Sequence, residues 1–454
     1  MYSKIGSESF HERNGLAENV VVDKSVSVFA PVRMKVEFES CKLDVYELYD
    51  LFAGKKEFAD LVEFCGKEKA VVDFDVIEAM GYVLSGDFEK DCISEGLNLK
   101  KISHTPYLDL LEKNLVEVIK SLHLRNGYPF ARKVFPLSVC LTHDVDEKKK
   151  TYQYFTRACR SLTAGKVLDS LQEIFEFFHD RLTGRNPYWT FNELVQIEEN
   201  FDVRSTFFFL EESAKLSANP KTWKHLGRRY RFDDEEVSNI IKFLREKGWE
   251  VALHGSYNSF KDLKLLKAEK ERLESVLGES VLGIRQHNLN FDFPETWEIH
   301  ERINLSYDTS LGFKSSRGFG FRWGTCKPFK PFSRDGRKID VLEIPLTLMD
   351  VSIGDPERGL EYVENLFKEV SRVNGVFCVL WHHVMFNSRE FPGWIELYRR
   401  LIELGKESNA VFLTAKEVDR LWRKMIDSPL KVSYGKGAAY SCDYPLVQVV
   451  ECSN

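Results

Sequence analysis

The chain has 454 residues, more than one domain of ordinary size usually holds, so we expect two domains. Hydrophobic residues make up 43% and charged residues 30% of the chain, which is typical of a globular protein with a sizeable core. The formal net charge is -6 and the charges are interspersed, which argues against nucleic acid as a partner.

The sequence carries no sign of export or of a membrane span. Residues 1–30 lack the basic start and apolar run of a signal peptide, and no segment approaches the roughly 20 apolar residues that a span needs. Nine cysteines are scattered from Cys41 to Cys452 without a Cys-x-x-Cys pair, which favours reduced thiols over disulfides or a zinc knuckle. We therefore expect a cytoplasmic location.

The chain up to about Pro136 mixes short apolar runs with charge clusters and carries no chemical motif. Residues 71–74 have the composition of a strand, and residues 108–124 have apolar side chains at helical spacing. We expect a small α/β domain of unknown function over residues 1–135.

Short apolar runs of strand length recur from Pro136 onward. The runs are residues 137–142, 205–210, 249–253, 281–284, 341–346, 376–381 and 410–413, with a weaker candidate at 303–307. Helices are predicted between them by start signals, which are Asp233 with Asp234, Pro294, and a capping box of Thr414 and Glu417. Residues 151–199 form a long, mostly helical insertion after the first strand.

Alternating strands and helices with nearly continuous apolar strands indicate parallel strands covered by helices. A distorted (β/α) barrel of seven or eight strands fits residues 136–425 best, and an open doubly wound sheet is the alternative. The periodicity fades afterwards, and residues 426–454 are predicted to be a C-terminal tail.

Polar side chains follow five of these strands on one side, and the carboxyl ends of barrel strands form the active-site face. They are Asp144, Asp146, His254, Arg285, His287, Asp350 and His382.

The first group lies in Leu-Thr-His-Asp-Val-Asp, residues 141–146. Side chains alternate along a strand, so Asp144 and Asp146 point the same way and His143 the other. Near a cation, one such carboxylate can bind metal while the other accepts a proton from water. The alternative is a turn or a helix cap, where Asp is common.

Single histidines and an arginine complete the pattern. His254 precedes Gly255 and is a suitable zinc or cobalt ligand, although a lone histidine is more often structural. Arg285 can bind a carboxylate through two nitrogens, or form a surface ion pair. His382 and His383 are neighbours, so only one can face the barrel mouth, and we expect His383 to be structural.

An aromatic loop spans residues 312–338. Either its rings offer faces for sugars, or the loop is a lid filled by its own side chains. The rings belong to Phe313, Phe319, Phe321, Trp323, Phe329 and Phe332.

At these motifs the sequence resembles the polysaccharide deacetylase superfamily, carbohydrate esterase family 4, over about residues 136–425. Besides the first motif, Arg-Ser-Thr-Phe-Phe-Phe (204–209) resembles the second strand and Glu-Val-Ala-Leu-His (250–254) the metal-histidine strand. Gly-Ile-Arg (283–285), Glu-Ile-Pro-Leu-Thr-Leu-Met-Asp (343–350) and Val-Leu-Trp-His (379–382) resemble the later motifs. The resemblance implies a distorted (β/α) barrel.

The resemblance also implies roles for these residues. Asp144 would be the catalytic base, tethered by Arg285, and Asp146 and His254 would bind metal. His382 would be the general acid, supported by Asp350.

The sequence departs from the family at one position. The second metal histidine normally stands four residues after the first, where this chain has Asn258. His287 lies two residues beyond Arg285, so a strand-like backbone turns both side chains to one side. We expect His287 to complete the metal site, or else to bind substrate or cap the next helix.

These expectations predict a metal-dependent hydrolase that removes acyl groups, foremost N-acetyl, from a sugar or polysaccharide. The expected cofactor is a divalent metal, zinc first, with cobalt or nickel as alternatives. The alternatives for the function are an inactive carbohydrate-binding barrel, a hydrolase of a non-sugar linear amide, and a barrel that only scaffolds the N-terminal domain.

Overall fold

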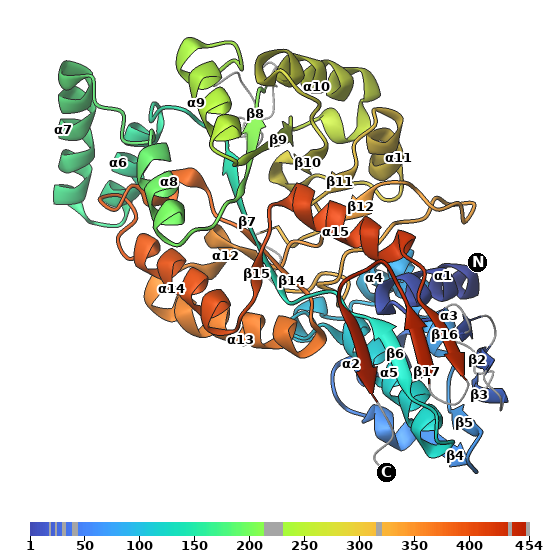
Figure 1. The fold of residues 1–454 in the computed structure, drawn as a ribbon. Helices are drawn as coiled ribbons and strands as arrows, with labels where there is room; N and C mark the ends of the chain where they lie inside the picture. The colour runs from blue at the N-terminus through green and yellow to red at the C-terminus, as the bar shows by residue number, and fades with distance from the viewer. Residues whose placement is uncertain are drawn as a thin grey trace.

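The computed structural model describes residues 1–17, 20–22, 25–29, 33–38, 44–212, 230–314, 320–434 and 438–450 (Figure 1). Within these ranges no helix is both long and apolar enough to cross a bilayer.

The N-terminal part folds around a five-stranded mixed sheet of order β1-β2-β3-β5-β4, in which only β3 and β5 run parallel. The strand predicted at residues 71–74 overlaps β5, and the predicted helix 108–124 is α5, whose apolar stripe is buried. The elements are α1 (Tyr2–Asn14), β1 (Val20–Val22), β2 (Ser25–Phe29), β3 (Arg33–Phe38), α2 (Val45–Phe52), η1 (Phe58–Leu61), β4 (Val62–Cys65), β5 (Lys69–Val72), α3 (Val76–Leu84), α4 (Asp87–Ser94), η2 (Leu99–Lys101), α5 (Tyr107–Arg125) and β6 (Phe130–Lys133).

The second part is built on a parallel sheet of order β12-β11-β10-β9-β8-β7-β14-β13, with β15 also paired to β7. Its strands are apolar on both faces because helices cover one face and the other faces the barrel interior. The strands are β7 (Ser138–Val145), β8 (Thr206–Leu210), β9 (Glu250–Gly255), β10 (Gly283–Gln286), β11 (Tyr307–Asp308), β12 (Leu342–Glu343), β13 (Leu348–Met349), β14 (Val376–Leu380) and β15 (Val411–Phe412).

The sheet curls because its two edges are joined by a very short connection. Strands β12 and β13 lie at opposite ends of the strand order, yet only residues 344–347 separate them. Four residues reach at most about 14 Å, so the edges must approach each other. The predicted distorted barrel is therefore confirmed, and an open doubly wound sheet is excluded.

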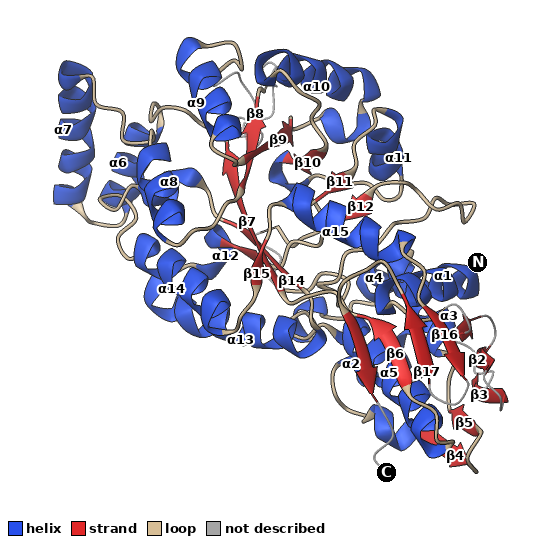
Figure 2. Cartoon of the chain, in the orientation of Figure 1, coloured by secondary structure: helices blue, strands red, loops and turns tan. Residues whose placement is uncertain are grey.

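Helices surround this barrel (Figure 2). The predicted capping box of Thr414 and Glu417 is present at α15, and Pro294 directly precedes α11. The helices are α6 (Gln153–Thr163), α7 (Val167–Thr183), α8 (Phe191–Asn200), α9 (Glu235–Glu246), η4 (Ser259–Lys261), α10 (Leu263–Leu277), η5 (His287–Leu289), α11 (Glu295–Arg302), α12 (Asp350–Ile353), α13 (Pro356–Val373), η6 (His383–Phe386), α14 (Trp394–Glu407) and α15 (Ala415–Asp427).

The two parts share an apolar cluster. Side chains of α1, α3, α4 and α5 pack in one continuous core with residues of the barrel, whose members are Trp297, Leu311, Trp323, Phe329, Phe332, Ile339 and Val341. The C-terminal segment also returns to the N-terminal part, because β18 (Val447–Val450) pairs with β6. It follows a hairpin of β16 (Lys431–Tyr434) and β17 (Ala438–Ser441).

Candidate active site

The seven predicted residues lie at or just beyond the carboxyl ends of strands. Asp144 lies in β7 and Asp146 directly follows it, His254 lies in β9, and Arg285 lies in β10, where it pairs in register with His254. His287 and Asp350 directly follow β10 and β13, and His382 lies two residues beyond the end of β14.

Asp144 is held by a buried guanidinium. Arg285 is fully buried, and its Nη1 donates to Asp144 Oδ1 at 2.9 Å and to Thr142 Oγ1 at 2.8 Å. Arg285 thus binds the carboxylate through one nitrogen, and the pair is not bidentate. Burial lowers the pKa of Arg285, but the charge and hydrogen bond of Asp144, together with the nearby thiols of Cys378 and Cys140, raise it above its usual value. The guanidinium therefore stays charged beside Asp144.

His254 presents one ring nitrogen to both carboxylates. Its Nδ1 donates to the carbonyl oxygen of Arg285 at 2.8 Å, which leaves Nε2 as the acceptor when the ring is neutral. That Nε2 lies 3.4 Å from Asp144 Oδ2 and 3.4 Å from Asp146 Oδ1. A backbone carbonyl that fixes the tautomer in this way is typical of metal-binding histidines.

His287 reaches the same carboxylate. Strand β10 ends at Gln286 and His287 begins the turn η5, but its Nε2 still lies 3.9 Å from Asp146 Oδ1. The rings of His254 and His287 have centroids 5.4 Å apart. Asn258 lies at the start of η4 and is half-buried. The structure therefore places His287 close to both Asp146 and His254.

The electrostatics of Asp146 are set by these rings. Burial raises its pKa, but the close imidazole rings of His254, His287 and His382 together lower it more, so the pKa lies well below its usual value. Burial lowers the pKa of His254, and Asp144 and Asp146 together raise it above its usual value.

His382 approaches the second carboxylate oxygen of Asp146 and is fixed by Asp350. Asp350 is fully buried, and its Oδ1 accepts from His382 Nδ1 at 2.8 Å while its Oδ2 accepts from the His382 backbone N at 2.6 Å. His382 Nε2 lies 3.8 Å from Asp146 Oδ2. Burial lowers the pKa of His382, but Asp350 overrides this and raises it to about 10. The ring therefore holds its Nε2 proton near neutral pH.

His383 has different surroundings. It is buried, and its ring nitrogens lie 3.2 Å from the Asp144 carbonyl oxygen and 3.0 Å from that of Glu147. Burial lowers its pKa to about 4, so the ring is neutral. His383 therefore supports the backbone on which Asp144 and Asp146 stand.

A buried carboxylate behind β7 was not foreseen from the sequence. Glu198 of α8 accepts from Tyr398 Oη, Ser205 Oγ and Trp249 Nε1, and it lies 2.9 Å from His143 Nε2. His143 Nδ1 donates to the carbonyl oxygen of Trp381. This network joins the strands that end at Asp144 and His382. A signal was available, because Glu198 continues the apolar stripe of Phe191, Leu194 and Val195 at helical spacing.

The donor set around Asp146 fits a divalent metal in its chemistry. Among the described residues, no three His, Cys, Asp or Glu side chains have the geometry of a finished metal site. However, Asp146 Oδ1 is buried without a hydrogen-bond partner, and two imidazole nitrogens lie 3.4 and 3.9 Å from it. Ligands about 2 Å from one ion lie roughly 3–4 Å apart, so both imidazole nitrogens lie at a ligand-like distance from Asp146 Oδ1.

The aromatic loop is largely filled by its own side chains. Phe321, Trp323, Phe329 and Phe332 are buried, the last three in the cluster shared with the N-terminal part. Phe313 lines a cavity of about 470 Å³ between that part and the barrel loops, together with Leu289, Phe291 and Arg322. Phe319 lies outside the described residues.

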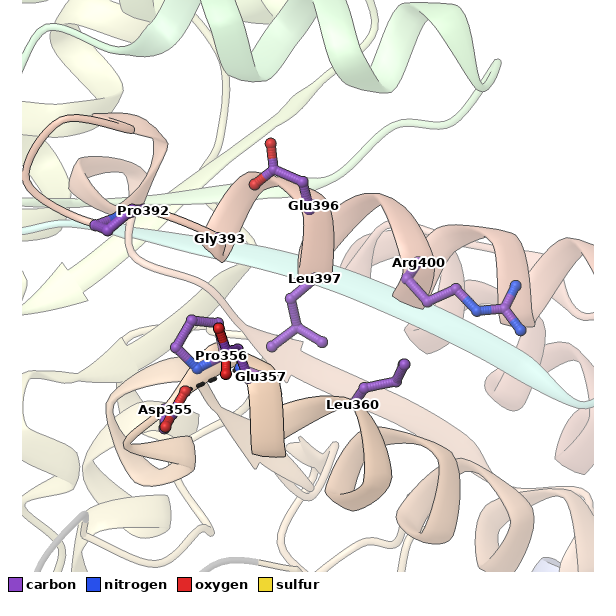
Figure 3. Close-up of a pocket in the computed structure, with 9 residues that line it drawn as sticks. All are labelled: Asp355, Pro356, Glu357, Leu360, Pro392, Gly393, Glu396, Leu397 and Arg400. Carbon is purple, nitrogen blue, oxygen red and sulfur yellow. Dashed lines mark hydrogen bonds between the residues drawn. The ribbon is translucent and has the colours of Figure 1, made fainter.

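A larger cavity of about 660 Å³ lies between the first turns of α13 and α14 (Figure 3). Pro356, Gly393 and Arg400 line it, and none of the seven predicted residues does. Because the chemically competent groups are elsewhere, we do not assign the substrate to this cavity.

No family model and no curated protein matches the chain. Solved structures that it resembles include a putative polysaccharide deacetylase from Mycobacterium smegmatis, at 16% identity and TM-score 0.42, over 67% of this chain and 96% of that chain. Puue allantoinase has 13% identity and TM-score 0.41, over 63% of this chain and 90% of that chain. A probable polysaccharide deacetylase from Pseudomonas aeruginosa PAO1 has 11% identity and TM-score 0.40, over 63% of this chain and 90% of that chain.

Proposed function

We propose that the chain is a metal-dependent hydrolase that removes acyl groups, foremost N-acetyl groups, from a sugar or polysaccharide. The observation that carries the proposal is one arrangement around Asp146. Asp144, held by buried Arg285, shares the close approach of His254 Nε2 with Asp146, and His382, held by Asp350, approaches Asp146 Oδ2. Amide hydrolysis needs such a pair, because a base must take a proton from water and an acid must give one to the leaving amine.

Asp144 acts as the base in this proposal. Arg285 occupies its Oδ1, so Oδ2 is the oxygen that accepts the proton of the attacking water. Because the guanidinium is buried and charged, its hydrogen bond fixes the direction of the carboxylate. The water then adds to the carbonyl carbon of the acyl group.

His382 acts as the acid. Its Nδ1 is committed to Asp350, so the proton on Nε2 is the one transferred to the amine nitrogen as the carbon–nitrogen bond breaks. Asp350 stabilises the charged ring before the transfer and fixes its orientation.

Asp146, His254 and His287 would hold the divalent metal, zinc or alternatively cobalt or nickel. A bound ion of this kind supplies a lowered water pKa, to about 7 for zinc, and polarises the carbonyl oxygen. A cytoplasmic location is part of the proposal, since the cysteines of the described residues are free thiols.

An inactive carbohydrate-binding barrel is the second candidate, favoured by Asn258 in place of the family's second metal histidine. The held base and acid argue against it, because a binding module needs neither.

Acetate release from a panel of N-acetylated sugars tests the proposal, with the disappearance of linear ureides followed on parallel samples. The protein stripped by a chelator should be inactive, and zinc should restore acetate release from at least one sugar. Turnover of ureides alone would show that the substrate is a non-sugar amide. If the zinc-loaded protein binds glycans but turns over nothing, the inactive barrel is correct.

A further inference from the structure

Helix α7 carries its apolar side chains on the outside of the molecule. Leu168, Leu171, Phe175, Phe178 and Leu182 follow one another at spacings of three and four residues, which places them on one face of the helix. All five are exposed, from Leu171 at 58% to Leu182 at 86%. Soluble proteins rarely leave so many large apolar side chains together in water, and such patches mark interaction surfaces.

The opposite face of α7 is polar and packs on the protein. Glu173 forms ion pairs with Lys150 and Arg157, and Lys150 is almost fully buried. Glu176 pairs with Arg389, and buried Asp180 accepts from Tyr154 Oη. A surface helix normally buries its apolar face, so this orientation is inverted. The ion pairs hold the apolar face outward.

The exposed charges of this helical hairpin, residues 151–185, are mostly positive. Arg160, Lys166, Arg181 and Arg185 are exposed, and Asp169 is the one exposed acid in that range, all of which the structure describes. The other acidic residues of α7 are Glu173, Glu176 and Asp180, which face the protein. The hairpin is thus cationic in a chain whose net charge is -6.

We propose that the α6–α7 hairpin docks on an anionic lipid bilayer, with the apolar face of α7 inserted among the lipids. A helix that combines Phe and Leu on one face with Lys and Arg beside them is the form that lies in a membrane interface. A second copy of the chain fits less well, because a two-fold interface would place the cations against each other. Docking goes beyond the proposed hydrolysis and does not depend on it.

The position of the hairpin gives docking a consequence for the barrel. The hairpin follows β7, which carries Asp144, and Lys150 also pairs with Glu390 in the segment after His382. Figure 1 shows α7 at the end of the molecule opposite to α1. The hairpin is therefore attached to loops at the carboxyl ends of the strands, so docking brings this end toward the lipid surface.

Co-sedimentation of the full chain with vesicles tests the proposal. Wild-type protein should sediment with phosphatidylcholine vesicles that contain phosphatidylglycerol, and much less with pure phosphatidylcholine. Leu171→Glu with Phe175→Glu should weaken binding at least about tenfold, because each side chain loses its transfer into the apolar layer. Arg160→Glu with Arg181→Glu should weaken it by a similar factor, since each cation near an anionic surface contributes about fivefold.

Phe243→Glu with Tyr362→Glu is the matched control, because it places two glutamates at exposed apolar positions of α9 and α13. This control should bind as wild type does, and circular dichroism should show all variants folded. The proposal is overturned if wild type ignores anionic vesicles, if it binds both vesicle types equally, or if the control loses binding too. It is also overturned if wild type is a dimer that the α7 variants convert to monomers.

Discussion

Two adjacent histidines, His382 and His383, have opposite surroundings, and this difference makes their roles separable. Asp350 raises the pKa of His382 to about 10, whereas burial lowers that of His383 to about 4. His382→Ala should therefore reduce turnover of amides by about a hundredfold or more, as loss of a general acid does. Activated esters, whose leaving groups need no proton, should be affected less.

The comparison variant is His383→Ala, which should lower stability and affect both substrates alike. Steady-state rates of each variant on a matched amide and ester give the ratio of the amide loss to the ester loss. Equal losses on both substrates in His382→Ala, or a larger amide loss in His383→Ala, would remove His382 from the acid role.

His287 offers a second test at the scale of one residue. Its Nε2 lies 3.9 Å from Asp146 Oδ1, and the family's usual second histidine is Asn258 here. His287→Ala should weaken zinc binding by at least the roughly 10–100-fold that losing a partner of a metal ligand costs. Isothermal titration with zinc measures this, and Asn258→Ala is the control. Unchanged affinity in His287→Ala, with loss in Asn258→Ala, would reverse the assignment.

At the scale of elements, the sequence predicted the strands of the barrel well because their apolar runs are continuous. Each predicted run overlaps a strand, including the weak candidate at 303–307, which became β11. It did not predict β13, which has two residues and too little pattern to recognise. The sequence analysis also missed Glu198, although Glu198 continues the apolar stripe of α8. It missed the outward apolar face of α7 because periodicity shows that a helix has two faces but not which one is buried.

One buried carboxyl on helix α10 makes stability depend on pH. Burial raises the pKa of Glu269 to about 7, and its Oε2 accepts from the Ser256 backbone N at 3.1 Å. The folded chain thus keeps a proton that the unfolded chain releases near pH 4.5. This contribution to stability is complete below about pH 4.5 and is lost as pH rises to about 7.

Glu269→Gln should remove that dependence. At pH 8 the variant should be more stable than wild type by up to about 3 kcal/mol, and the two should converge near pH 4.5. Urea unfolding at both pH values measures the difference. A stability gap that is the same at pH 5 and pH 8 would show that Glu269 does not titrate in this range.

At the scale of the whole molecule, the boundary predicted near residue 135 crosses a shared interior. Arg13 of α1 pairs with Asp109 and Glu112 of α5, and Glu112 also lies 3.5 Å from Lys327 Nζ of the barrel. All four side chains are buried, and the apolar cluster around them includes Trp323 and Phe329. Separating the two parts would expose this cluster and leave Lys327 without its buried partner.

A chain that begins at Lys133 should therefore lack a cooperative unfolding transition, although the sequence pattern alone predicts a domain boundary near residue 135. Thermal unfolding followed by near-ultraviolet circular dichroism, with the full chain as control, measures this. A sharp transition in the shortened chain would show that the barrel folds alone.

The catalytic account depends most on Asp144 being the base and not a metal ligand. Its Oδ1 is bound by Arg285, and His254 Nε2 lies equally far from Asp144 and Asp146. Zinc content and acetate release, measured on one sample of Asp144→Asn beside wild type, separate the two roles. We predict one zinc per chain in both proteins and turnover lower by about 10²–10⁴-fold in the variant. Loss of zinc from Asp144→Asn, or turnover close to that of wild type, would contradict the account.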